Sequence, residues 1–251
     1  MNCAVRKSGG RAFPAAAMLL CGLFSAFAAV GGETDLAPAA FLERARRPNQ
    51  VDTWAMLSGR LQHRREGGKA ESMSIYFGII IQKDRSTGQL VFDGREGYLL
   101  GQARDRKGAS VIPMQKSTTL IDHTGVRASD LTLDFLYYDL VREDREEKLG
   151  GYVACRVMVL SSPDKAEQVR VFLSKTYYFP LRAEFFRAGE KEPWRILETG
   201  GFTRRNDLYY VRRLLIEGPG WRTRIDFNEA ELGLYKPETA PKNLIRKLSG
   251  K

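Results

Sequence analysis

Cysteine and histidine are scarce in this sequence, which has three cysteines and two histidines among 251 residues. No H-E-x-x-H, paired C-x-x-C or G-x-S-x-G motif is present. Such residues and motifs supply many of the metal ligands, redox centres and nucleophiles of enzymes. We therefore expect no catalytic residue, no metal and no cofactor, and we predict that the protein is not an enzyme.

The few titratable candidates have ordinary explanations. His63 is expected where a strand runs into a turn, and Asp134 is expected on a solvated face. His123 follows an aspartate in a loop, but adjacency in sequence does not define a catalytic geometry. The acidic run within residues 141–151 is interrupted by arginine and lysine, which favours a solvated helix end or loop over the oxygen cage of a cation site.

The N-terminus has the features of a signal peptide at residues 1–28. A basic start precedes the apolar run AAAMLLCGLFSAFA, and Ala26-Phe27-Ala28 fits the small-x-small cleavage pattern. One alternative is a membrane anchor, but the run is shorter than the roughly 20 residues of a spanning helix. Another is a lipid on Cys21, but Leu20 stands where that signal needs a small residue. We predict cleavage, export to the periplasm and one domain at residues 29–251.

Cleavage would leave Cys155 as the one remaining cysteine, so no internal disulfide could form. The exported chain must then be held together by core packing, which a hydrophobic content of 43% allows. Cys155 lies in the apolar stretch YVACRVMVL, beside Val157 and Val159 on the same predicted strand face. We expect a buried structural thiol there.

Acidic residues are outnumbered, 30 against 40 basic ones, which gives a formal net charge of +10. Residues 1–28 hold three basic residues and no acid, so the mature chain would carry +7. Nucleic acid is not expected as the partner of an exported protein. Anionic lipid head groups, lipopolysaccharide or acidic partners suit the charge, and so does a plain solvated surface.

Long helical patterns are missing, whereas period-two alternation recurs along the chain. Residues 36–48 predict one short helix that ends at Pro48, and from residue 53 onward about ten strands follow with glycine-rich turns. Odd-numbered positions are mostly apolar and even-numbered ones carry the charge, which is typical of an antiparallel sheet with one wet face. We predict a mainly β (α+β) fold, a strongly curved antiparallel half-barrel around short helices, with the strands within residues 53–228.

Residues 129–138 break this alternation and predict a second short helix. Ser129 suits a helix N-cap, and Leu131, Phe135 and Tyr138 recur at steps of four and three. Two short helices are little material to cover a wide curved sheet. We therefore expect leftover apolar space on the concave face, with the helix of 129–138 as a lid or plug over it.

Several segments resemble the outer-membrane lipoprotein-sorting proteins, the LolA/LolB-like superfamily. They are VRASDLTLDFLYYD (126–139), GGYVACRVMVLSS (150–162), the hairpin at 169–191 and RRLLIEGPGWRTRIDF (212–227). The resemblance covers about residues 50–230 and depends on the order and spacing of these motifs. It implies a strongly curved antiparallel sheet wrapped around helices, with a cavity for acyl chains.

We therefore predict periplasmic binding of lipid or lipoprotein acyl chains, in lipoprotein sorting or envelope lipid handling. The predicted partners are a lipid or acylated lipoprotein and inner- or outer-membrane lipoprotein transport components, with peripheral membrane contact. One alternative is a non-catalytic envelope interaction module with a filled core, and another is an enzyme acting on envelope lipid or glycan. The predicted ligand-binding residues are apolar and share the concave face: Met73, Ile75, Phe77, Ile79, Ile81, Leu131, Phe135, Val157, Val159 and Phe185.

Overall fold

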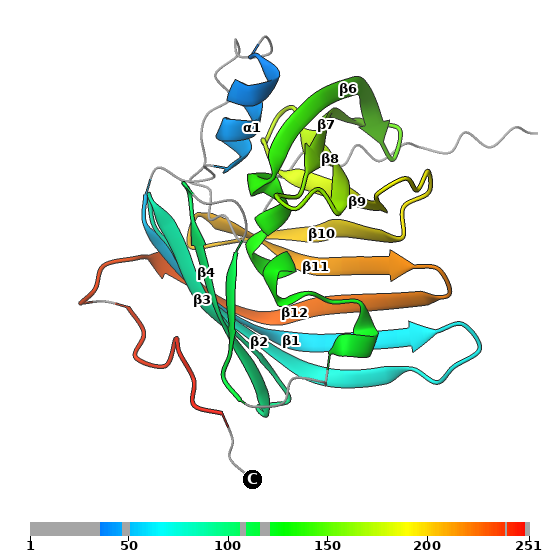
Figure 1. Cartoon of the computed structure of the whole chain (residues 1–251). Helices are drawn as coiled ribbons and strands as arrows, with labels where there is room; N and C mark the ends of the chain where they lie inside the picture. Colours follow the sequence, from blue (N-terminus) through cyan, green and yellow to red (C-terminus); the bar gives the residue numbers. More distant parts are fainter. Residues whose placement is uncertain (1–35, 47–50, 106–108, 116–120, 239, 249–251) are drawn as a thin grey trace, which may run out of the picture.

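A computed structural model describes residues 36–46, 51–105, 109–115, 121–238 and 240–248. The predicted signal peptide lies outside these residues. Twelve strands form one antiparallel sheet in the order β5-β4-β3-β2-β1-β12-β11-β10-β9-β8-β7-β6, which curves into an open half-barrel (Figure 1). The predicted fold class is confirmed, with twelve strands instead of about ten. No helix in the described residues is long and apolar enough to cross a membrane.

The helices and strands follow the predicted order. One α-helix, α1 (Pro38–Arg46), precedes the sheet, and three 3-10 helices separate its two halves. These are η1 (Asp122–Thr124), η2 (Ala128–Thr132) and η3 (Asp134–Tyr137). The strands are β1 (Thr53–Arg65), β2 (Glu71–Ile81), β3 (Arg85–Phe92), β4 (Glu96–Ala103), β5 (Ser110–Pro113), β6 (Asp139–Leu149), β7 (Val153–Ser161), β8 (Glu167–Ser174), β9 (Pro180–Arg187), β10 (Arg195–Arg205), β11 (Leu208–Gly218) and β12 (Trp221–Leu234).

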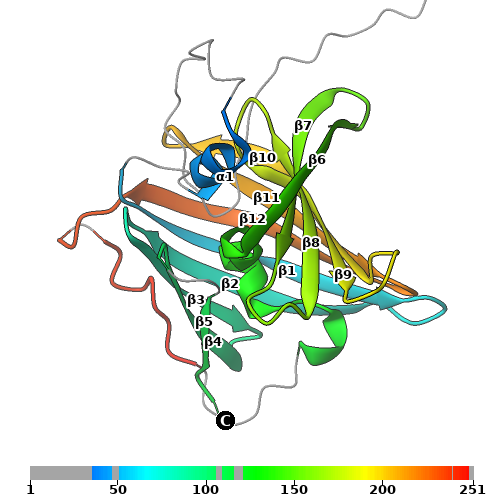
Figure 2. The same cartoon turned by 45° about the horizontal axis from the view of Figure 1, so that its top comes forward.

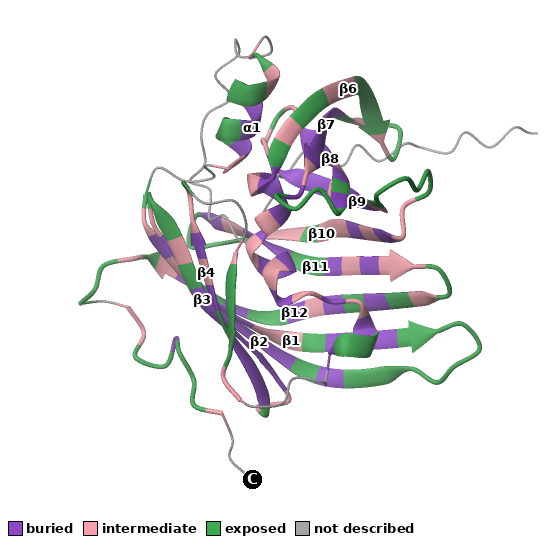
Figure 3. Ribbon diagram, viewed as in Figure 1, coloured by how far each residue is buried: buried purple, intermediate pink, exposed green. Residues whose placement is uncertain are grey.

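The concave face is lined by the apolar residues that the alternation predicts. In the pairing of β1 with β2, Leu57 lies opposite Phe77 and Ala55 opposite Ile79. Directly opposed residues in an antiparallel pair point to the same face, so these side chains form one continuous wall. Buried and exposed residues accordingly alternate along β1 and β12 (Figure 3).

In β7 the face assignment from the sequence is wrong. The register places Met158 opposite Val171, and Val171 opposite Ala183, on the concave side with Phe185. Val157 and Val159 therefore point to the opposite face of the sheet. The sequence does not separate the two faces because β7 is apolar on both, with six consecutive buried residues.

The predicted solvated helix end or loop at 141–151 is also wrong, because most of this run forms β6. This strand is an edge of the sheet, and two irregularities in its register with β7 hide the period-two pattern in the sequence. Its carboxylates pair with arginines of neighbouring strands, Glu143 with Arg156 and Glu147 with Arg170. Charges and bulges on an edge strand also discourage pairing with another sheet.

The concave face is covered by α1 and by residues 121–138, which we call the cover segment (Figures 1 and 2). The predicted helix at 129–138 is instead two 3-10 turns, η2 and η3, separated by Leu133 in the left-handed conformation (φ 53°). Ser129 is not the N-cap, since η2 begins after Arg127. Two short turns still bury Leu131 and Phe135 on one side, which is why the sequence pattern resembles an α-helix.

The C-terminal tail, residues 240–248, packs on the outer face of β1–β3 instead of the concave face. Leu244 is buried in a small cluster with Met56, Tyr76 and Val91. The Gln89 side-chain amide donates to the carbonyl of Arg246 and accepts from its N–H, both at 2.7 Å. The tail thus covers the apolar part of the outer face.

Close approach of the tail requires glycine at position 78. A Cβ there would lie 2.3 Å from the carbonyl oxygen of Leu244, which also accepts a 2.8 Å hydrogen bond from the Tyr76 hydroxyl. The tail backbone is therefore fixed against the sheet by contacts that a larger residue would prevent.

We predict that Leu244→Ala lowers the free energy of unfolding by about 2–3 kcal/mol, because it removes the buried centre of the outer cluster. Ile245→Ala is the matched control, since Ile245 is half exposed and should change stability by less than about 0.5 kcal/mol. Urea unfolding of both variants measures this difference. Equal losses would show that the tail is not docked through Leu244.

Candidate functional site

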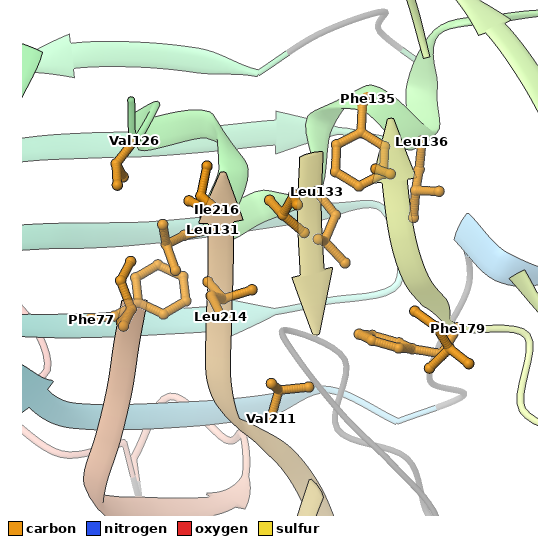
Figure 4. Close-up of a cluster of buried hydrophobic side chains, with 14 of the residues drawn as sticks. Phe77, Val126, Leu131, Leu133, Phe135, Leu136, Phe179, Val211, Leu214 and Ile216 are labelled. Atoms are coloured by element: carbon orange, nitrogen blue, oxygen red, sulfur yellow. The ribbon is translucent and has the colours of Figure 1, made fainter. Parts of the chain in front are cut away.

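The interface between the cover segment and the concave wall is the candidate site. Leu131 and Phe135 are both fully buried, and Leu131 points toward Phe77 and Ile216 (Figure 4). Phe135 meets Phe185 edge to face, with ring centroids 5.6 Å apart. The cover segment therefore enters the half-barrel as an apolar plug, in agreement with the predicted position of its two apolar residues.

A buried ion pair anchors the middle of the cover segment. The Arg195 guanidinium, from the start of β10, pairs with the Asp130 carboxylate, and both side chains are almost completely buried. Arg195 also donates to the carbonyl of Gly125 at 3.0 Å and lies over the Phe185 ring. Asp130 accepts a second hydrogen bond from the N–H of Arg127 at 2.8 Å. The turn at 125–130 is thus fixed to the sheet by charge-assisted hydrogen bonds.

A second arginine ties the same turn to β8. Both terminal nitrogens of Arg127 donate to the Glu167 carboxylate at 2.9 Å, and the guanidinium stacks over the Trp194 ring. This bidentate geometry is the most specific that an arginine makes with a carboxylate. Because Arg127 is more exposed than Arg195, this contact is easier to break.

A third arginine, Arg46 at the end of α1, binds the C-terminal end of the cover segment. The Arg46 side chain donates to the carbonyls of Leu136 and Tyr138, at 2.6 and 2.8 Å. Beside it lies a shallow pocket of about 30 Å³, lined by residues of α1, η2 and η3 and by Ile81, Arg104, Phe179 and Pro180. That volume has room for a water or two and not for an acyl chain.

His63 of β1 and His123 of η1 lie side by side. From the sequence, His63 was expected at the end of a strand and His123 in a loop. His63 is buried, and its Nδ1 lies 2.8 Å from the Thr223 hydroxyl, while the His123 ring stands edge-on to it. Burial lowers the pKa of His63, and the His123 charge adds to this effect. His123 Nε2 lies 2.7 Å from a Glu71 carboxylate oxygen. The Thr223 hydroxyl also donates to the carbonyl of Thr124, so this cluster fixes η1 to the sheet.

Asp134 is not on a solvated face, contrary to the sequence prediction. Its carboxylate is half-buried between the two 3-10 turns, and burial raises its pKa to about 7. The negative charge of Asp130 raises this pKa further, whereas a hydrogen bond from the Ser129 side chain opposes the rise. The cover segment therefore contains a carboxyl group that titrates near neutral pH.

This pKa predicts a pH-dependent effect of Asp134→Asn. Because the folded state raises the pKa from 3.8 to about 7, the group's stabilisation is complete below pH 4 and is lost as the pH rises through 7. Asparagine stays neutral, so the variant should be more stable than wild type by about 1–3 kcal/mol at pH 8, and nearly equal at pH 4.

Urea unfolding of both proteins at the two pH values tests this expectation. Asp122→Asn is the control, because Asp122 is an exposed acid in the same segment and should have little effect at either pH. A stability difference that does not change between pH 4 and pH 8 would contradict the titration of Asp134.

We also predict that Asp130→Asn costs about 3–5 kcal/mol, because it leaves the buried Arg195 charge uncompensated. Glu217→Gln breaks a more exposed pair with Arg222 and should cost about 1 kcal/mol or less. The double variant Arg195→Met/Asp130→Asn should unfold at higher urea than Asp130→Asn alone, since no charge then remains buried. A double variant that is less stable than Asp130→Asn would contradict this account.

The predicted binding residues divide into two groups in the structure. Nine of the ten belong to one cluster of buried core residues: Met73, Ile75, Phe77, Ile79, Ile81, Leu131, Phe135, Val157 and Phe185. By the register of β7 with β8, however, Val157 and Val159 point away from the concave face. Sequence reasoning missed Arg46, Arg127 and Arg195, although Arg195 had a visible signal: it occupies an odd-numbered position in a strand whose next odd position is the buried Leu197.

The described residues offer little for catalysis. Within these ranges, no group of three His, Cys, Asp or Glu side chains is placed to hold a metal ion. Cys155 is fully buried, and burial raises the pKa of its thiol to about 11, so the reactive thiolate is disfavoured. The arrangement is suited to burying apolar groups under a cover that polar contacts hold in place.

Comparison with known proteins identifies the fold. No family model and no curated protein matches the sequence. An outer membrane lipoprotein-sorting protein domain from Vibrio parahaemolyticus is 14% identical, covers 81% of this chain and 93% of its own, and has a TM-score of 0.61. A DUF1329 family protein from Desulfovibrio piger is 16% identical over 76% and 90% of the two chains, with a TM-score of 0.56.

A LolA superfamily protein from Nitrosomonas europaea is 12% identical, over 84% of this chain and 100% of its own, with a TM-score of 0.52. At these identities the likeness concerns the fold. The chain therefore has a LolA-like fold, an open antiparallel half-barrel around short helices, as the resemblance of its motifs implied.

Proposed function

We propose that this chain is exported through a cleaved signal peptide at residues 1–28 and binds acyl chains of lipids or lipoproteins in the periplasm. The ligand would lie against the concave wall, where the cover segment now packs. The observation that carries this proposal is the cover itself. One non-α segment, interrupted at Leu133, covers a continuous apolar wall and is held there by three arginine-centred contacts.

The energetics favour a ligand that displaces the apolar side chains of the cover segment, not one that enters an empty cavity. Each buried methylene of an acyl chain is worth about 0.8 kcal/mol. In the closed state, Leu131 and Phe135 already fill the space beside Phe77 and Phe185. A ligand that displaces them gains only the difference between two apolar occupants, so its binding is weaker than its apolar area alone suggests. Reversible binding of this kind suits a protein that must release its cargo.

The η3 end of the cover segment is the part that we propose to move. The 3-10 turns η2 and η3 have few hydrogen bonds of their own, and Leu133 between them adopts a conformation that costs energy in a non-glycine residue. Arg46 donates to the carbonyls of Leu136 and Tyr138 and lies over the Tyr137 ring, and it also pairs with Glu43 of its own helix. None of its contacts with the cover involves a carboxylate, so releasing the cover leaves no carboxylate there without its partner. We propose that opening begins at the η3 end and that the Arg195–Asp130 pair remains as the hinge.

Lipoprotein sorting is the proposed context. The Vibrio parahaemolyticus domain with this fold is described as an outer membrane lipoprotein-sorting protein domain. The corresponding partners of this chain would be an acylated lipoprotein and the transport components of the inner or outer membrane. We propose a binding role without catalysis.

A second function is favoured by one observation, the packing of the concave face. A half-barrel whose cover buries Leu131 and Phe135 completely also suits a non-catalytic interaction module of the envelope, with a filled core and no ligand. Lipid extraction and native mass spectrometry of protein purified from membranes distinguish the two functions, since only the carrier retains lipid.

We predict that a fatty acid with a photoreactive group in its chain labels the concave wall. Mass spectrometry of the labelled protein should locate the adduct on peptides of β2, β9 or the cover segment. Arg46→Ala should speed labelling several-fold, because it frees the carbonyls of Leu136 and Tyr138. Arg44→Ala is the matched control, since Arg44 lies exposed on the same helix and should leave the rate unchanged.

Two outcomes would count against the carrier. Labelling confined to the outer cluster of Met56, Val91 and Leu244 would show that the probe binds beneath the tail. No labelling at all, together with no extracted lipid, would favour the interaction module.

A further inference from the structure

The outer face of the sheet carries a group of arginines near the β1–β2 turn. In the sheet order, β1 lies beside β12, and β12 beside β11. The registers place Arg64 opposite Arg222, and Arg60 opposite Asp226, which in turn lies opposite Arg213. Directly opposed residues share a face, so these side chains project together from the outer surface. We call five of them the arginine patch: Arg60, Arg64, Arg213, Arg222 and Arg224.

The five arginines of the patch are spread over the surface of three neighbouring strands and do not line a groove. Neighbouring strands lie about 4.8 Å apart, and alternate residues on one strand about 6.7 Å apart. Five guanidinium groups on three adjacent strands therefore lie within reach of a single flat surface. All five are exposed, Arg222 with 65% of its side-chain surface accessible.

The positive charge of the patch is only partly compensated. Asp226 accepts from Arg213 and Arg224, and Glu217 pairs with Arg222. Within the described part of the chain, Arg60 and Arg64 have no ion-pair partner. Five positive and two negative charges leave a local excess of +3. Like charges this close repel one another, so a negatively charged partner would be bound with a gain in free energy.

The charge distribution favours a lipid surface over an acidic protein. Protein interfaces usually have an apolar centre depleted of charge, whereas Arg224 and Asp226 occupy the middle of this array. The apolar part of the outer face lies elsewhere and is covered by the tail through Leu244. Guanidinium groups bind phosphate oxygens in bidentate geometry, and mobile lipid phosphates can adjust to an array of fixed arginines.

We propose that the arginine patch docks the protein on the phosphate groups of an anionic phospholipid membrane. This inference is independent of acyl-chain binding, because it concerns the opposite face of the sheet. The patch would hold the outer face against the membrane by charge alone, without insertion of a hydrophobic segment.

Co-sedimentation of the full mature chain with vesicles tests the proposal. We expect binding to mixed phosphatidylcholine–phosphatidylglycerol vesicles, none to phosphatidylcholine alone, and release in about 1 M salt, where the screening length is about 3 Å. Arg60→Gln/Arg64→Gln should weaken binding by about 25-fold, at about five-fold for each arginine. Both positions are exposed, so the variant should keep the wild-type unfolding midpoint.

The matched control is Arg145→Gln/Lys148→Gln. It removes the same charge from exposed positions of β6, outside the patch, and should change vesicle affinity by less than two-fold. Equal weakening by both double variants would overturn the proposal, since binding would then follow net charge. Absence of binding to anionic vesicles would also overturn it, and binding to soluble polyglutamate in that case would assign the patch to an acidic protein.

Discussion

The ion pair between Arg195 and Asp130 is the constraint on which the closed structure depends. Arg195 is a fully buried arginine at a core position of β10, and its Nη1 has no hydrogen-bond partner among the described residues. A buried guanidinium is tolerated only when a carboxylate neutralises it. Asp130 supplies that charge from the cover segment, so burial of Arg195 and docking of the cover require each other. Without its cover, the sheet would either expose the Arg195 guanidinium to solvent or leave its charge buried without a carboxylate partner.

The sheet was predictable from the sequence because its alternation of apolar and polar residues repeats over many positions. The conformation of the cover segment was not predictable in this way. Period-two alternation extends over many residues in β1, β2 and β12, so local exceptions do not change the prediction. Leu131 and Phe135 are four residues apart, and an α-helix or two 3-10 turns around Leu133 bury both equally well. The backbone conformation of Leu133 comes from its contacts with the rest of the fold, which a sequence pattern does not contain. The burial of Leu131 and Phe135 was therefore predictable from the sequence, whereas the backbone conformation at Leu133 between them was not.

The errors in β6 and β7 have a related origin. Bulges shift the register of β6 by one residue at a time, and each shift reverses which face a side chain occupies. In β7 both faces are apolar, so Val157 and Met158 are equally good core residues by composition. Only the pairing with β8 shows that Met158 lies on the concave side. The polar contacts of the site were still harder to predict, because Arg46 and its carbonyl partners are about 90 positions apart in the sequence.

The outer face shows how one sheet can present two different surfaces. Toward β2 and β3 its side chains are apolar, and the tail covers them through Leu244 and the paired amide of Gln89. Toward β11 and β12 the arginine patch is left open. If the tail crossed the patch instead, the basic residues of the tail would add to its repulsion, and the apolar part would stay exposed. The position of the tail therefore follows from charge as well as from hydrophobic burial, and it leaves the basic half of the face free for an anionic partner.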